Sequence, residues 1–263
     1  FMLNYSNRYF LNKYMDIKEV GLYSLGAKIA GIIPFLFTEP VNMAFGPYIY
    51  SMIDDAEKCK KQLADFSRFF FAGLAIMALI ISFFAKEAIA IMADTNYSGS
   101  HSIVFVLSAS YLFMGLGGII VTGIHISMKT WLVSLIWAFS AVINIGLNIL
   151  LIPKYGRLGA SIATMLSSLV ILICYFIAVF KVYPVHFEYL KYAYLSIMMI
   201  TSNIIAQYID KYLQYAFIFK LVLLIAFISS LLMSGYFSTQ EKHKVITFVK
   251  SRVRKYILKQ EYQ

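Results

Sequence analysis

The chain has 263 residues, of which 60% are hydrophobic, 17% aromatic and only 14% charged, and its mean hydropathy is +0.74. Soluble domains carry about 25% charged residues, so this composition excludes an ordinary soluble domain and predicts a membrane protein. The formal net charge of +10 indicates contact with anionic lipid headgroups, and no nucleic-acid partner is expected because no recognition motif accompanies the basic residues.

The N-terminal segment 1–12 begins without an initiator methionine and has neither a basic leader nor a small-residue cleavage site. No signal peptide is therefore expected, and the sequence looks like a fragment truncated at its N-terminus. This segment is either the end of a further membrane span or an interfacial strip rich in Tyr and Phe.

Seven apolar stretches follow, each near or above the roughly 20 residues that a helix needs to cross a bilayer. They are continuously apolar rather than alternating, which favours helices over barrel strands. The sequence predicts an all-α polytopic membrane helix bundle, with about seven full transmembrane helices plus the end of an eighth. The stretches are 20–52, 66–92, 102–125, 131–152, 158–181, 190–209 and 214–236.

The first full span carries a stripe of polar residues on an otherwise apolar helix. At 100° per residue, Gly31, Phe35, Glu39 and Asn42 fall near the same face as Lys28. Lys28 and Glu39 lie eleven residues, or about 16 Å of helical rise, apart, too far for a simple ion pair. They are predicted to line a watery cavity at two depths. Snorkelling of Lys28 to the nearer interface is the alternative.

Three prolines, Pro34, Pro40 and Pro47, fall in this same span. Each removes a backbone hydrogen bond, and kinked helices at cavities are how transporters build binding sites and hinges. The prolines are therefore candidates for gating, and Glu39 for gating or ion coupling. The alternative for Glu39 is a structural role at the break before Pro40.

Two asparagines, Asn144 and Asn148, continue one helical face with Ser140. An amide in hydrocarbon needs a partner or a water-filled cavity, so either substrate contact or packing between helices explains them. A short basic turn follows, and Gly159, Ala163 and Ser167 then repeat every four residues, which predicts close helix contact.

The C-terminal part contains Lys220 near an end of the last span, where snorkelling is the expected solution. The tail 239–263 is basic, and apolar residues recur in it at helical spacing, so it is predicted to lie along the anionic cytoplasmic leaflet. A disordered, solvated tail is the alternative. Lys and Arg are more frequent in cytoplasmic loops, and their distribution here places the C-terminus in the cytoplasm. This orientation depends on the basic residues of the tail.

Enzyme signatures such as G-x-S-x-G, H-E-x-x-H or a Walker-type loop are absent from the sequence. Cys59 and Cys174 fall in different environments, so neither a disulfide nor metal chemistry is expected. His125 is either a proton relay or a structural histidine. Transport is thus favoured over catalysis, without a cofactor.

Several short motifs, in order, resemble the polysaccharide and O-antigen flippases of the multidrug/oligosaccharidyl-lipid/polysaccharide exporter superfamily, which are MATE-like transporters. The motifs are Asn7-Arg8-Tyr9-Phe10-Leu11, Val20-Gly21-Leu22-Tyr23-Ser24-Leu25-Gly26-Ala27-Lys28, Ala44-Phe45-Gly46-Pro47, and Asn144 to Asn148 followed by Ile152-Pro153-Lys154-Tyr155-Gly156. The order is that of the second half of such a protein.

The resemblance implies that 1–181 is the end of the seventh helix and helices eight to twelve of a C-terminal transport lobe. It makes 182–238 two additional helices and 239–263 the cytoplasmic tail. Such proteins flip oligosaccharides linked to undecaprenyl diphosphate across the bacterial inner membrane, for lipopolysaccharide or exopolysaccharide synthesis, by alternating access between two lobes. The missing N-terminal lobe would be a partner, so this fragment alone should not transport.

The resemblance also assigns roles to residues. Lys28 matches a cationic site and would attract the diphosphate. Arg8 matches the arginine of an Asp-Arg pair and is a second candidate for substrate binding, although Asn7 stands where the acid usually is. Asn42, Asn144 and Asn148 complete the predicted substrate-binding set.

Two other functions stay open. One is an ion-coupled multidrug exporter of the same superfamily, for which Glu39 would be essential. The other is a membrane-embedded glycosyl or acyl transferase of the same pathway, for which His125 would be essential and Lys28 dispensable.

Overall fold

The computed structural model describes residues 2–212 and 216–237, and all regular structure in these ranges is helical. The predicted amphipathic tail lies outside the described residues. The helices are α1 (Met2–Tyr14), α2 (Ile17–Ala30), the π-helix η1 (Pro34–Thr38), α3 (Glu39–Tyr50), α4 (Ala56–Phe83), α5 (Ala85–Met92), the 3-10 helix η2 (Thr95–Ser100), α6 (His101–Ile120), α7 (Thr122–Ile126), α8 (Trp131–Val182), α9 (Tyr189–Tyr212) and α10 (Ala216–Met233).

Five helical stretches within the described residues are long and apolar enough to cross a membrane. They are Ile17–Tyr50, Ala56–Phe83, Thr95–Ile126, Trp131–Val182 and Ala216–Met233. The predicted number of seven spans is therefore not supported, although a helix covers each predicted position. The stretch predicted at 190–209 is helix α9, but tyrosines and amide side chains dilute its apolar run.

Helix α8 is a hairpin rather than one rod. Gly156 adopts φ 54° and ψ −131° inside it, so two helical arms meet at this residue. The arms run side by side, because the Ser140 hydroxyl donates a hydrogen bond of 3.0 Å to the carbonyl oxygen of Ser167. The predicted segments 131–152 and 158–181 are these two arms, and the basic turn between them lies where the sequence placed it.

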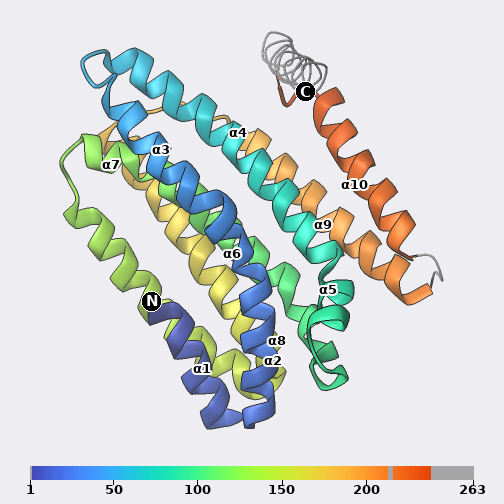
Figure 1. Cartoon of the computed structure of the whole chain (residues 1–263). Helices are drawn as coiled ribbons and strands as arrows, with labels where there is room; N and C mark the ends of the chain where they lie inside the picture. The colour runs from blue at the N-terminus through green and yellow to red at the C-terminus, as the bar shows by residue number, and fades with distance from the viewer. Residues whose placement is uncertain (1, 213–215, 238–263) are drawn as a thin grey trace, which may run out of the picture.

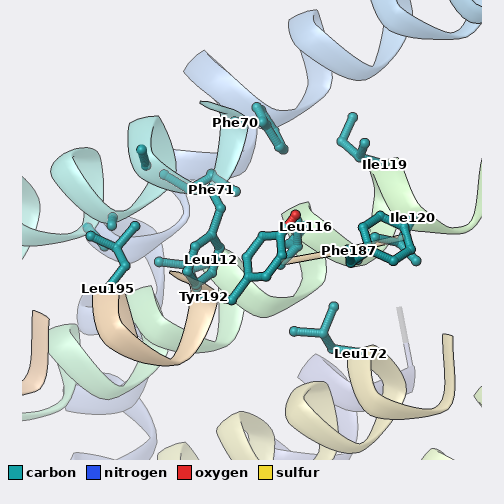
Figure 2. Packing of buried hydrophobic residues seen from close by; sticks show 14 of the residues in the cluster. Phe70, Phe71, Leu112, Leu116, Ile119, Ile120, Leu172, Phe187, Tyr192 and Leu195 are labelled. Atoms are coloured by element: carbon teal, nitrogen blue, oxygen red, sulfur yellow. The ribbon is translucent and has the colours of Figure 1, made fainter. Parts of the chain in front are cut away.

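The main hydrophobic core joins α4, α6, the second arm of α8, and α9. Figure 2 shows side chains from these helices converging. Phe71 of α4 and Tyr192 of α9 make an edge-to-face ring contact with centroids 5.4 Å apart, an arrangement that aromatic pairs favour. The remaining cluster members labelled in the figure are Phe70, Leu112, Leu116, Ile119, Ile120, Leu172, Phe187 and Leu195.

The helices differ in how far the bundle covers them. In Figure 1, α9 and α10 lie on the side of α4 opposite to α1 and α8. In the most apolar window of each span, 67% of residues are buried for η2–α6–α7 and 61% for α4, but only 33% for α2–η1–α3. The α2–η1–α3 rod, which carries most of the predicted site residues, is therefore at the edge of the bundle.

Candidate functional site

The predicted polar stripe on the α2–η1–α3 rod is only partly exposed, because Asn42 packs toward α6. The side chains of Lys28, Phe35 and Glu39 are exposed, and Phe35 retains 75% of its accessible surface. Neither Lys28 nor Glu39 forms an ion pair within the described part of the chain. The structure thus leaves one cation and one anion of the rod accessible.

Lys28 borders an open hollow of about 290 Å³. The walls are Gly21, Ser24 and Leu25 of α2, together with Ala93 and Tyr97 from the connection that precedes α6. The Tyr97 ring lies close to Gly21, where a Cβ atom would meet its Cε1 at 3.5 Å. Lys28 therefore lies beside a space that can hold water or an anionic group.

The rod changes its helical type at the prolines. Pro34 opens the π-helical turn, and Pro40 is at the start of α3, which continues directly from that turn. Pro47 lies inside α3. Single π-turns inside α-helices recur at functional sites because they interrupt the regular hydrogen-bond ladder. Sequence indicated a bend here, but it did not predict the π-helix.

Asn42 is half-buried on the side of α3 that faces α6. A Cβ atom at Gly118 would meet its Nδ2 at 2.9 Å, and its Oδ1 is buried without a hydrogen-bond partner. One turn earlier, Thr38 makes the same approach to Gly115, with its Oγ1 3.1 Å from a Cβ placed there. The glycines of α6 thus let polar residues of the rod pack closely.

Asn144 and Asn148 are fully buried and belong to a hydrogen-bonded network between helices. Asn148 donates to the Oδ1 of Asn7 at 2.8 Å and to the Oδ1 of Asn144 at 3.1 Å. Asn7 in turn donates to the Tyr23 hydroxyl at 2.7 Å and to the Thr164 hydroxyl at 2.6 Å. These hydrogen bonds join α1, α2 and both arms of α8. Of the two alternatives for the asparagines, substrate contact and packing between helices, this arrangement corresponds to packing.

Arg8 follows Asn7 on α1 and is half-buried. It therefore lies next to the asparagine network along the chain, whereas Lys28 and Glu39 are exposed. The structure separates the predicted residues into two groups: an exposed stripe with Lys28 and Glu39, and a buried seam with Asn144 and Asn148.

The expectation that Lys220 snorkels to the interface is wrong. Its side chain is 0% exposed, and its ammonium lies 2.6 Å from Asp210 of α9 and 2.9 Å from Glu87 of α5. Burying an ammonium is tolerated when carboxylates compensate its charge, which they do here. The partners come from other helices, so spacing along α10 could not reveal them, although a lysine in an apolar span predicts a counter-ion.

Three further ion pairs, at two places in the bundle, went unnoticed in the sequence. Arg157, directly after Gly156, pairs with Glu19 of α2, whose carboxylate also accepts a hydrogen bond from the Arg157 backbone N–H. At the other end of the bundle Glu188 bridges Arg68, at 2.6 Å, and Lys191, at 2.7 Å. Within the described residues no group of three or more His, Cys, Asp or Glu could hold a metal ion.

Comparison with known proteins gives limited support for a function. No protein-family model and no solved structure matches the chain. A curated relative, the capsular polysaccharide biosynthesis protein CapF of Staphylococcus aureus, is 28% identical over 162 residues. The match covers 60% of this chain and 40% of that protein, so the chain spans less than half of the relative's length.

Proposed function

We propose that the chain is one lobe of a membrane transporter that flips a lipid-linked oligosaccharide for surface polysaccharide synthesis by alternating access. The similarity to a capsular polysaccharide biosynthesis protein suggests the pathway. The observation that carries the transport step is the position of Lys28, exposed beside an open hollow in a membrane-length helix.

A lysine in the middle of a span costs about 2.5 to 3.5 kcal/mol on insertion scales, so a compensating environment is required. The hollow beside Lys28 supplies one, because it leaves room for water or for an oxyanion next to the ammonium. A diphosphate is the group that a compact, mobile ammonium binds well. Lys28 would therefore hold the diphosphate of an undecaprenyl-diphosphate carrier while the sugar crosses.

Glu39 and the prolines would supply the moving part. The π-turn and the three prolines weaken the hydrogen-bond ladder between Lys28 and the end of α3, which favours bending there. Glu39, exposed at the start of α3, would bind a coupling ion or proton when the face is closed. A second lobe, packed against the exposed α2–η1–α3 face, would complete the cavity.

Asn42, Arg8 and the asparagine seam take secondary roles in this proposal. Asn42 lies on the flank of the rod and would reach the sugar path after a small rotation of α3. Asn144 and Asn148 contact α1 in this conformation, so they would reach substrate only if α1 moved away. In this proposal, Asn144 and Asn148 hold the helices of the lobe together while the α2–η1–α3 rod bends.

The test is a Lys28→Gln substitution in the whole protein that contains this chain, with Lys28→Arg and Lys18→Gln as matched variants. Lys18 is an exposed lysine on the same helix. The readouts are surface polysaccharide in cells and dithionite quenching of a fluorescent lipid diphosphate sugar in proteoliposomes. Loss of a charge-assisted contact worth about 1.5 to 3 kcal/mol predicts roughly tenfold or more slower flipping for Lys28→Gln.

Lys28→Arg should retain much of the activity, and Lys18→Gln should retain nearly all of it. Normal flipping by a well-folded Lys28→Gln variant would contradict the proposal. Resistance to toxic cations that requires Glu39 and not Lys28 would assign the protein to the multidrug exporters instead. A transferase would be indicated by an inactive His125→Ala variant alongside an active Lys28→Ala variant.

A further inference from the structure

A second cavity, of about 540 Å³, lies away from the α2–η1–α3 rod. It is enclosed by the ends of α4 and α9, the start of α6, and the beginning of the second α8 arm. α4 ends at Phe83, α6 begins at His101 and α9 ends at Tyr212, so the cavity opens at one end of the bundle. In Figure 1 this end is at the lower right, around α5.

Among the ionisable residues that line this cavity, basic side chains outnumber acidic ones. Lys86, His101 and Lys211 line it, and all three side chains are exposed. The one acid in the lining is Asp210, which is already held by Lys220 at 2.6 Å. Within the described part of the chain neither Lys86 nor Lys211 forms an ion pair, so the two lysines favour an anionic ligand.

The same cavity has an apolar side. Phe83, Phe105 and Leu158 form part of its wall, while Ser82 and Asn203, joined by a hydrogen bond of 2.9 Å, form a polar contact between α4 and α9. A ligand that fits both parts needs an anionic head and a hydrocarbon chain. Basic pockets between transmembrane helices are the sites that anionic lipid headgroups occupy.

We propose that this cavity binds the phosphate headgroup of an anionic phospholipid between Lys86 and Lys211, with an acyl chain along the wall of Phe83, Phe105 and Leu158. The headgroup fits the volume, which lies within the 300–1,000 Å³ range of small-molecule sites. The lipid would join α9 to α5 and α6 at the membrane surface. This site is independent of the flippase proposal, because it involves neither Lys28 nor Glu39.

The test is native mass spectrometry of the detergent-solubilised protein with phosphatidylglycerol or phosphatidylcholine of identical acyl chains. We compare wild type with the Lys86→Gln/Lys211→Gln double variant. The matched control is Lys13→Gln/Lys18→Gln, which removes two exposed lysines from the α1–α2 junction. Each basic residue near a lipid surface contributes about fivefold in affinity, so phosphatidylglycerol should bind the double variant roughly tenfold or more weakly.

Phosphatidylcholine should bind wild type more weakly than phosphatidylglycerol does, and Lys86→Arg/Lys211→Arg should restore binding of the anionic lipid. Equal losses in the control pair, or equal affinity for both lipids, would overturn the proposal. Displacement by glycerol 3-phosphate at the affinity of the whole lipid would also overturn it, because it would assign the site to a soluble phosphate. If the glutamine variant does not fold, the comparison of the two lipids on wild type still tests whether the protein prefers the anionic lipid.

Discussion

At the scale of single residues, two lysines in apolar spans show two ways to offset the free-energy cost of a charge within the membrane. Lys220 is 0% exposed and bridges Glu87 and Asp210, whereas Lys28 is exposed beside a hollow. The sequence placed both lysines within spans but could not distinguish them. The reason is that the Lys220 partners lie 133 and ten residues away in the chain, on other helices.

Replacing Lys220 by Met should destabilise the protein strongly. The substitution conserves the apolar stem but leaves two carboxylates without their cation, and breaking a buried pair costs about 3 to 5 kcal/mol. We expect the lower end of this range, because Glu87 and Asp210 are a third and a quarter exposed and stay partly hydrated. Thermal unfolding in detergent measures the loss.

The triple variant Glu87→Gln/Asp210→Asn/Lys220→Met is the control for Lys220→Met. It removes all three charges, so it should recover a large part of the lost stability. A Lys220→Met variant as stable as wild type would mean that the ion pairs contribute nothing to the packing of α10.

The ion pairs of Glu188, at the other end of the bundle, should make the stability of the fold depend on pH. Partial burial alone would raise its pKa, but hydrogen bonds from Lys191 and Arg68 outweigh burial and lower the pKa below its usual value. A lowered pKa in the folded state means that the contribution to stability is present above the unfolded value, about 4.3, and is lost as the pH falls through the folded value.

We therefore expect the melting temperature to fall more steeply below pH 4.3 in wild type than in Glu188→Gln. Because Glu188 is 52% exposed, the difference at pH 7 should be small. Unfolding curves at pH 7 and pH 3.5 measure it. Identical acid sensitivity of the two proteins would exclude a contribution from this bridge.

At the scale of elements, the α8 hairpin was predicted from sequence because its turn has local signals. A proline and a glycine interrupt the apolar run, and small residues follow at spacing four. The structure confirms the close contact, since a Cβ atom at Gly159 would collide with the backbone carbonyl group of Leu151. The π-helix had no comparable signal, because Pro34 alone predicts a kink and not its hydrogen-bond pattern.

Gly159→Ala should therefore destabilise the hairpin by about 1 to 3 kcal/mol, because the colliding atoms are backbone and cannot rotate away. Gly146 is the matched control on the same helix, since a Cβ atom there meets nothing within 4 Å. Gly146→Ala should be neutral or slightly stabilising. Thermal unfolding of the two variants separates them, and equal stability would refute the close contact.

At the scale of the whole molecule, composition predicted the all-helical membrane class, and hydropathy located a helix at each predicted position. The count of seven spans is not supported: five stretches of the described residues qualify, with the two-armed α8 counted once, and α9, which carries Asn203 and Gln207, is not among them. The division of the polar residues between an exposed stripe and a buried seam could not be predicted. It depends on which helices neighbour α2 and α8, and a single sequence does not contain that information.

The central claim is that the position of Lys28 is in contact with water although it lies within a span. The most direct measurement is the reaction of a Lys28→Cys variant with a charged, membrane-impermeant methanethiosulfonate, in a Cys59→Ala/Cys174→Ala background. The control is Ile225→Cys, because Ile225 is 55% exposed on the apolar helix α10 and would face lipid.

Only an ionised thiol reacts, and ionisation requires water, so Lys28→Cys should react on the order of tenfold or more faster than Ile225→Cys. If Lys28→Cys reacts as slowly as Ile225→Cys, position 28 faces hydrocarbon, and the account is contradicted.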